Sequence, residues 1–296
     1  MQRMGIQKMK VYIKQHDSHA GKWIYRGYAE AWKAKGFEVV FYKSLNEIIS
    51  TNYHLMAIDA DVSLDNIKVL SNSTKTFLFV QPNSFPKHWG THPNFISLCS
   101  VDAIPIINQM DNVFKWTWMT PDPTHFNVWT NVCKVPLAFD SLSYTYRYNK
   151  SYRFDVCYIG GRADNGFNEK HKIMMDHLGA FKDSGLKCGF FINRNLTHEM
   201  ENWILYGSKV SLNIHDAYQQ QLGLDTNERT FKALGLTGCL VSDSVEDIKN
   251  LNLPAKLALD PDDMLDQVYE LIDEPDLEGI KSTNRQYILD NHTYLK

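Results

Sequence analysis

Short apolar runs alternate with amphipathic segments along the chain. The first half holds four apolar runs of strand length, at residues 10–14, 37–42, 55–59 and 76–80. Between the first two, residues 23–35 repeat apolar side chains at helical spacing, and Gly36 follows. A strand, a helix and a second strand in this order predict a βαβ unit in a parallel sheet.

The same alternation restarts in the second half. Strands are predicted at 154–159, 186–192, 208–214 and 238–242, and helices at 168–183, 197–206, 227–236, 261–274 and 276–291. The fold class is therefore α/β, with two Rossmann-like, doubly wound domains at 1–145 and 146–296. We expect the two domains to face a cleft lined by loops 15–21 and 160–167. The last helices are expected to pack back toward the N-terminal domain.

Composition narrows the class of protein. Of the 296 residues, 44% are hydrophobic and 22% are charged, which is typical of a soluble globular protein. No apolar run approaches the roughly 20 residues that span a bilayer, and the first residues do not resemble a secretory signal. The five cysteines are odd in number and lie far apart, which favours free thiols and a cytoplasmic location, in a host cell if the protein is viral.

The charge is unevenly distributed. Residues 1–150 hold 16 of the 31 Lys and Arg residues and 11 of the 34 Asp and Glu residues. Residues 151–296 therefore hold 15 Lys and Arg and 23 Asp and Glu. The first half is thus about +5 and the second −8 by the same counts. A basic first half permits an anionic partner such as DNA, although ordinary scatter explains the same numbers.

Residues 225–243 carry the clearest candidate chemistry. A polar segment opens a short helix with Arg229 in its first turn, and a Gly and an apolar strand follow. Helix N-termini offer free N–H groups to an anion, and an arginine adds charged donors. The pattern suits a diphosphate.

Residues 154–243 resemble the donor domain of GT-B glycosyltransferases, in particular the CgeB-like group. Three segments carry the resemblance: 155–162, a strand that ends in glycines; 208–215, a strand that ends in a polar pair; and 227–243. The resemblance implies a transferase that takes a sugar from a nucleotide sugar. We expect a hexosyltransferase, and a UDP-sugar is the favoured donor. It also implies that no metal or other cofactor is required.

The resemblance assigns donor-binding roles by position. Glycines would let the backbone approach the phosphates, and Arg229 would neutralise the diphosphate. The residues assigned to the donor are Gly160, Gly161, Arg162, His215, Asn227, Glu228 and Arg229. Lys232 stands where the family has a ribose-binding glutamate, and a lysine cannot accept those hydrogen bonds. We consider Glu228 as the residue that could bind the ribose in place of that glutamate.

Inverting transfer needs a general base for the acceptor hydroxyl. His16, Asp17 and His19 are the densest titratable group after the first strand, and the sequence does not rank them. The turn Asp59–Asp61 is interpreted as a strand-end turn rather than a metal motif. His88, Trp89 and His92, in a long polar loop, are candidate acceptor contacts.

The acceptor stays open at this stage. A hydroxymethylated DNA base, as in phage-type enzymes, is one hypothesis; a cell-surface polysaccharide, a protein or a small metabolite is another. A non-enzymatic, two-lobed ligand-binding protein is a separate class of function. The sequence gives no prediction of the oligomeric state.

Overall fold

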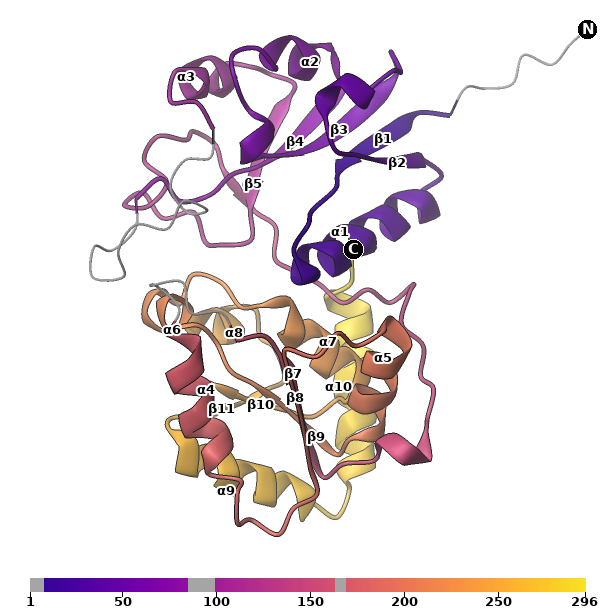
Figure 1. The fold of residues 1–296 in the computed structure, drawn as a ribbon, viewed down its shortest axis with the longest axis vertical. Coiled ribbons are helices and arrows are strands. Elements are labelled where there is room, and N and C mark those ends of the chain that lie inside the picture. The colour runs from indigo at the N-terminus through magenta and orange to yellow at the C-terminus, as the bar shows by residue number, and fades with distance from the viewer. Residues whose placement is uncertain (1–7, 85–98, 163–168) are drawn as a thin grey trace, which may run out of the picture. The chain divides into compact units, whose positions relative to one another are not determined.

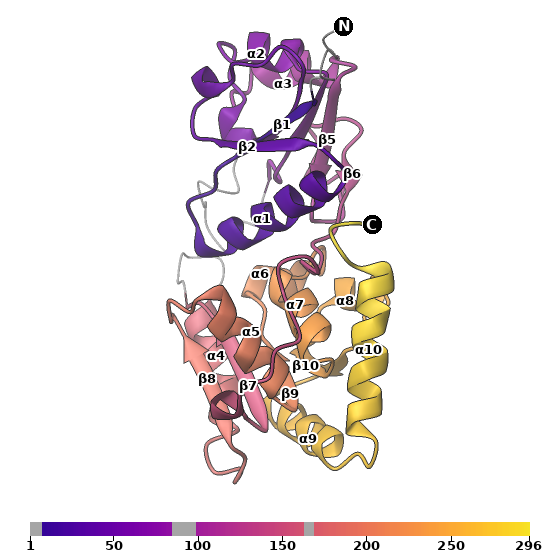
Figure 2. The same ribbon diagram turned by 90° about the vertical axis from the view of Figure 1, so that its right-hand side faces the viewer.

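The computed structural model describes residues 8–84, 99–162 and 169–296. The chain divides into two compact units, Met1–Pro136 and Leu137–Tyr294, and each is considered by itself. The division lies nine residues before the predicted boundary at 145. Figures 1 and 2 show both units as ribbons.

The N-terminal unit is built around one six-stranded sheet with the order β2-β1-β3-β4-β5-β6, in which every pair of neighbours is parallel. Its strands are β1 (Lys10–Lys14), β2 (Glu38–Tyr42), β3 (Tyr53–Ile58), β4 (Lys75–Phe79), β5 (Val113–Thr117) and β6 (Cys133–Lys134). Its helices are α1 (His19–Ala34), α2 (Ile67–Asn72) and α3 (Ala103–Asn108). The sequence predicted the first four strands and missed the last two.

Local chemistry sets the limits of α1. The Ser18 side chain accepts the N–H of Gly21 at the N-terminus, and Gly36 follows the helix with a φ of 92°, which favours glycine. One face of α1 packs through Tyr25 and Ala29 on Val11 and Trp116 of the sheet. Burial of this face on the strands stabilises the βαβ unit that the pattern predicted.

The C-terminal unit has a five-stranded parallel sheet with the order β11-β10-β9-β7-β8. Its strands are β7 (Val156–Gly160), β8 (Cys188–Ile192), β9 (Val210–Asn213), β10 (Leu240–Asp243) and β11 (Lys256–Ala258). Its helices are α4 (Lys170–Gly179), α5 (His198–Gly207), α6 (Ala217–Leu222), α7 (Glu228–Leu236), α8 (Glu246–Asn250), α9 (Pro261–Ile272) and α10 (Leu277–Asn291). All the predicted strands and helices of this half are present, with ends shifted by a few residues.

Helices cover both faces of this sheet (Figure 1). α4 and α9 bury Met174 and Met264 in one core with Tyr158 and Val241 of the strands. α7 packs on β9 and β10 from the other side, with α5 and α10 against it. The chain therefore has two doubly wound α/β units, as the alternation predicted. The predicted packing of the last helices toward the N-terminal domain stays a prediction, since α10 packs on α7 of its own unit.

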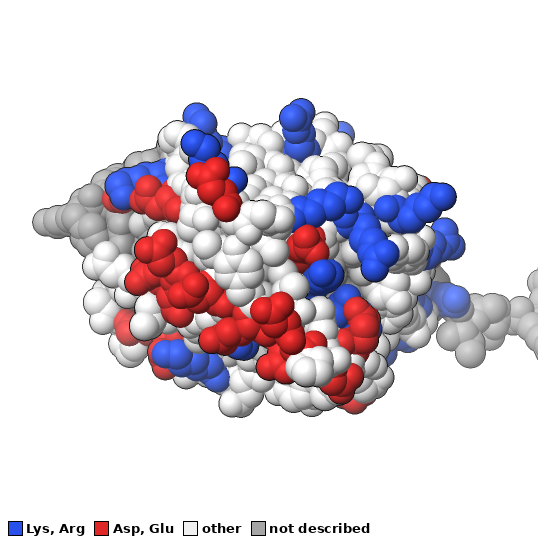
Figure 3. Space-filling view, turned by 90° about the horizontal axis from the view of Figure 1, so that it is seen from below, with Lys and Arg blue, Asp and Glu red and all other residues white. Residues whose placement is uncertain are grey.

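One face of the C-terminal unit is strongly acidic. Residues 260–278, which include α9, hold nine Asp and Glu and no Lys or Arg. Figure 3, seen from below, shows Asp and Glu side chains gathered on this face. Such a surface repels polyanions such as nucleic acids.

Candidate active site

The carboxyl edge of the C-terminal sheet brings together polar residues from three neighbouring strands. β7 ends at Gly160, β9 ends at Asn213 and β10 ends at Asp243. β7, the first strand of this unit, lies between β8 and β9. The next strand along the chain, β8, is on one side of β7, and the strand after that, β9, is on the other side, so the strand order reverses at β7. Open α/β sheets bind ligands at this topological switch point. The donor-site candidates of the sequence gather here.

Arg229 is fixed on three sides. Its Nη1 donates to Asn213 Oδ1 at 3.0 Å and to the Ile214 carbonyl at 3.3 Å, and its guanidinium lies 5.1 Å from the centre of the Tyr158 ring. Burial opposes its charge, yet Tyr158, Glu228 and nearby carboxylates keep the pKa of Arg229 above its ordinary value. The result is a half-buried, permanently charged fork in the first turn of α7.

Gly160 is required by the space around Arg229. A Cβ at this position would lie 2.4 Å from the Tyr158 hydroxyl and 3.0 Å from Arg229 Nη2. The neighbouring Gly161 has room, with Asn193 Oδ1 at 3.7 Å from the same kind of Cβ. Arg162 is exposed, and its backbone N–H donates to Asn193 Oδ1 at 2.7 Å. Of the three predicted residues, Gly160 is therefore the one adapted to the arginine.

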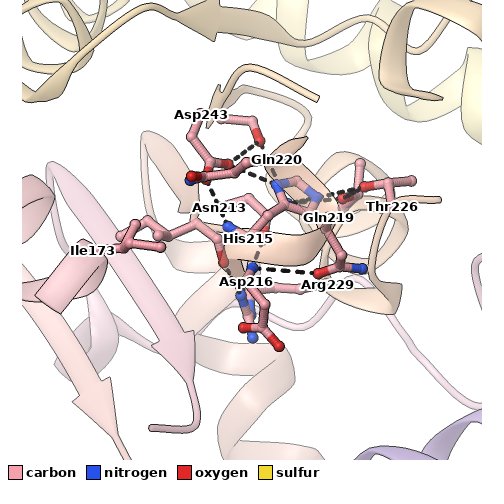
Figure 4. Close-up of polar contacts among 12 residues, drawn as sticks. Ile173, Asn213, His215, Asp216, Gln219, Gln220, Thr226, Arg229 and Asp243 are labelled. Carbon is pink, nitrogen blue, oxygen red and sulfur yellow. Dashed lines mark hydrogen bonds and ion pairs between the residues drawn. The ribbon is translucent and has the colours of Figure 1, made fainter. Parts of the chain in front are cut away.

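His215 is completely buried within a hydrogen-bond network (Figure 4). Its Nδ1 lies 2.6 Å from Asp243 Oδ1, its backbone N–H donates to Asp243 Oδ2, and its Nε2 lies 2.8 Å from Thr226 Oγ1. With the ring proton on Nδ1, Nε2 is an acceptor, which also suits Asn213 Nδ2 at 3.2 Å. His215 thus supports the Asn213 side chain that holds Arg229, and its own contacts are all internal.

Asp243 anchors this network as an anion. Burial alone would raise its pKa, but His215, Lys170 and Gln220 outweigh burial and hold the pKa of this carboxyl well below its usual range. The network links β10 to α7 through His215 and Thr226. It fixes the start of the helix that bears Arg229.

Lys170 is a second cation at the site, and sequence reasoning missed it. It is the first residue of α4, 4% exposed, and its Nζ donates to the Ile214 carbonyl and pairs with Asp216 Oδ1 at 3.3 Å. Arg229 donates to the same carbonyl, so the two cations lie close together. The signal in the sequence was a lysine soon after the glycines that end β7.

Asn227 and Glu228 begin α7. Asn227 is its N-cap, but the side chain makes no capping hydrogen bond, and its Oδ1 is buried without a partner in the described part of the chain. Glu228 Oε1 lies 3.1 Å from Lys232 Nζ. Both groups are placed beside Arg229 by the first turn of the helix.

Lys232, the departure from the family pattern, faces carboxylates. Its Nζ lies 2.6 Å from Glu201 Oε1, and Tyr144 donates to Glu201 Oε2 at 2.6 Å. Burial disfavours the ammonium, yet Glu201 and Glu228 raise the pKa of Lys232. Glu228 is the carboxylate of this group with the largest exposed fraction, which keeps it as the candidate for the ribose hydroxyls.

The base candidates of the N-terminal unit lie after β1. His16 is half-buried and stacks on Tyr25, and its Nδ1 lies 3.1 Å from the Ser18 backbone N–H, which must donate to it. When a neutral imidazole accepts a hydrogen bond through Nδ1, its proton is on Nε2. Neither ring nitrogen is then free to take the proton of an acceptor hydroxyl. Burial lowers the pKa of His16, and Asp17 is exposed. His19 is the first residue of α1. His88, Trp89 and His92 lie outside the described residues.

Residues 167–296 match the family model described as glycosyl transferase-like. T4 phage BGT in complex with its UDP-glucose substrate is similar in fold, with a TM-score of 0.56, 10% identity and 95% of each chain covered. The C-terminal part of the chain is thus similar in sequence to glycosyl transferases, and the whole chain has the GT-B fold.

A second solved structure agrees with this assignment of fold. The DNA modifying enzyme β-glucosyltransferase, with and without uridine diphosphoglucose, has a TM-score of 0.59, 12% identity, and coverage of 95% of this chain and 94% of its own. Identities this low show the fold alone. Curated protein sequences give no significant match. The similarity of residues 167–296 to glycosyl transferases favours an enzyme over a non-enzymatic ligand-binding protein.

Two further findings concern metals and membranes. Among residues 8–84, 99–162 and 169–296, no three His, Cys, Asp or Glu side chains are grouped so that they could hold a metal ion. In the same ranges, no helix has the length and apolar character that crossing a bilayer requires.

Proposed function

We propose that the chain transfers a sugar from a nucleotide sugar, with a UDP-sugar favoured, to an acceptor hydroxyl. The observation that carries this proposal is the Arg229 guanidinium beside Gly160, at the switch point of the C-terminal sheet and the N-terminus of α7. A helix N-terminus and an arginine fork are both complementary to a diphosphate. The C-terminal unit is therefore the proposed donor-binding domain, and the N-terminal unit the acceptor domain.

The proposed chemistry is metal-independent. As the sugar leaves, negative charge develops on the nucleoside diphosphate and must be stabilised. Lys170 and Arg229 supply two positive charges around one carbonyl, and α7 adds its N–H groups. These groups do the electrostatic work that a divalent cation does in other transferases.

Arg229→Ala should weaken UDP binding by about 1.5–3 kcal/mol, the range for a hydrogen bond to a charged group. This corresponds to roughly a tenfold to hundredfold higher Kd. Isothermal titration with UDP, GDP and ADP measures the effect and identifies the preferred base. Arg147→Ala, which removes an exposed arginine of the same unit, is the matched control. Equal UDP affinity in both variants would remove Arg229 from the site.

A hydroxymethylated DNA base is the acceptor that we propose first. The excess of positive charge in residues 1–150 and the acidic face of the C-terminal unit both favour DNA on the N-terminal unit. The similar solved structure described as a DNA modifying enzyme matches over almost the whole length of both chains. Transfer from UDP-glucose to hydroxymethylcytosine DNA, compared with unmodified DNA, tests this acceptor. Activity on a polysaccharide, a protein or a metabolite alone would replace it.

The cytoplasm, of a host cell if the protein is viral, is the proposed compartment. Cys133, Cys157, Cys188 and Cys239 are free thiols, and two of these four, Cys157 and Cys239, are buried. Such thiols persist in a reducing environment. Rapid loss of activity in the absence of a reductant would agree with this location.

A further inference from the structure

The switch point of the N-terminal sheet holds a cluster of charged groups that no role above explains. β1 lies between β2 and β3, so the carboxyl ends of β1 and β3 form the switch point of this unit. Lys14 ends β1, and the turn Asp59–Asp61 directly follows β3. By the rule applied above to the C-terminal sheet, a ligand of this unit is expected to bind here.

The two carboxylates of this turn have opposite surroundings. Asp61 is fully paired, with Lys14 Nζ at 2.6 Å from Oδ1 and the Tyr42 hydroxyl at 2.9 Å from Oδ2. Asp59 is 2% exposed, and its Oδ1 has no hydrogen-bond partner among the described residues. Buried carboxylate oxygens are normally hydrogen-bonded, so an oxygen left open at a switch point needs a reason.

The surroundings of Asp59 keep its proton available near neutral pH. Burial raises its pKa to about 7, the backbone N–H of Ala60 opposes this, and the charge of Asp61 adds to it. Tyr25 of α1 is the titratable group that approaches both carboxylates from the helix side, and burial raises its own pKa well above the usual value. Lys14 and Tyr42 are engaged by Asp61. Asp59 is therefore the group of this cluster that can gain and lose a proton near pH 7.

We propose that this switch point binds a hydroxyl-bearing acceptor and that Asp59 is the base that takes the proton of the hydroxyl. The inference rests on the proposed function. A hydroxyl that donates to Oδ1 supplies the missing hydrogen bond. His16, whose Nδ1 is occupied by Ser18, is poorly placed for the role. Asp17 is exposed to water.

The step is a direct displacement. The acceptor oxygen forms a bond with the anomeric carbon of the sugar while its proton passes to Asp59. The bond from that carbon to the diphosphate oxygen breaks, and the nucleoside diphosphate leaves with the electron pair. One displacement inverts the anomeric carbon, so UDP-α-glucose should give a β-glucoside. A product with retained configuration would overturn the assignment.

Asp59→Asn is the deciding variant, because an amide has nearly the same shape but cannot take a proton. We expect the kcat of glucose transfer from UDP-glucose to hydroxymethylcytosine DNA to fall about a hundredfold or more. The Kd for UDP should not change. The kcat/KM of the wild type should rise with pH through about 7, as Asp59 ionises, and this rise should be absent from the residual activity of the variant. The His16→Gln variant should keep this rise of kcat/KM with pH.

Asp65→Asn is the matched control, since it removes an exposed carboxylate a few residues further along and should stay fully active. A second readout does not need the acceptor. Because the pKa of Asp59 is raised on folding, the wild type loses stability as pH rises from about 4 through 7. The Asp59→Asn variant should lose less unfolding free energy than the wild type over that pH range, as measured by urea denaturation.

The possible failures are distinguishable. Full transfer activity in Asp59→Asn, with intact UDP binding, would overturn the role of Asp59 and leave the proposed function in place. A wild type that neither binds UDP nor transfers or hydrolyses the sugar of UDP-glucose would overturn both.

Discussion

Lys232→Met should destabilise the C-terminal unit by about 3–5 kcal/mol, the cost of removing one partner from a buried ion pair. The ammonium is the counter-charge of Glu201, and the two side chains are 9% and 6% exposed. Without it, Glu201 keeps the Tyr144 hydrogen bond but loses the cation that holds its pKa below the usual value despite burial. Urea denaturation followed by circular dichroism measures the loss.

Two comparisons separate the buried pair from a general effect of removing a lysine. Lys249→Met breaks an exposed pair with Glu246 at 3.3 Å and should cost less than about 1 kcal/mol. The double change Lys232→Met with Glu201→Gln should recover part of the loss, because no unpaired charge then stays buried. Similar losses in Lys232→Met and Lys249→Met would contradict the assignment.

The same lysine shows what the sequence can and cannot predict. α7 and β10 were predictable because a polar cap, a 3.6-residue apolar repeat and a compact apolar run are local signals. Lys232 was noted in the sequence as a departure from the family pattern, but its partner Glu201 is 31 residues away on α5. A contact of that kind depends on how two helices pack, and no local pattern encodes it.

The candidate sites divide in the same way. Arg229 and Gly160 were predictable because a glycine at a strand end and an arginine at a helix start have a direct physical use. Lys170 was missed because its role depends on reaching the end of β9, 44 residues further along the chain. Asp59 and Asp61 look alike in sequence, and the pairing of one with Lys14 distinguishes them.

Asp243→Asn should cost on the order of 3 kcal/mol, because hydrogen bonds to a buried charged group contribute about 1.5–3 kcal/mol each. Both carboxylate oxygens accept: Oδ1 faces His215 Nδ1, and Oδ2 takes the His215 backbone N–H and the Gln220 amide. An asparagine must turn its NH₂ toward one of these donors. His215 and Asn213 then lose their fixed orientation, so UDP affinity should fall as well, through Arg229.

Acid should affect the wild type and this variant differently. The pKa of Asp243 is depressed on folding, so its contribution is fully present above its ordinary value of 3.8 and is lost as pH falls below that value toward the folded pKa. The unfolding free energies of the two proteins, measured in urea at pH 7, 4 and 3, should therefore converge at the acid end. Other carboxylates titrate in both proteins, and the difference between the proteins isolates Asp243. A difference that stayed constant down to pH 3 would show that packing, rather than charge, holds the His215 network. Asp243→Glu, which keeps the charge and adds a methylene, tests this explanation, because a packing effect would make it about as unstable as Asp243→Asn.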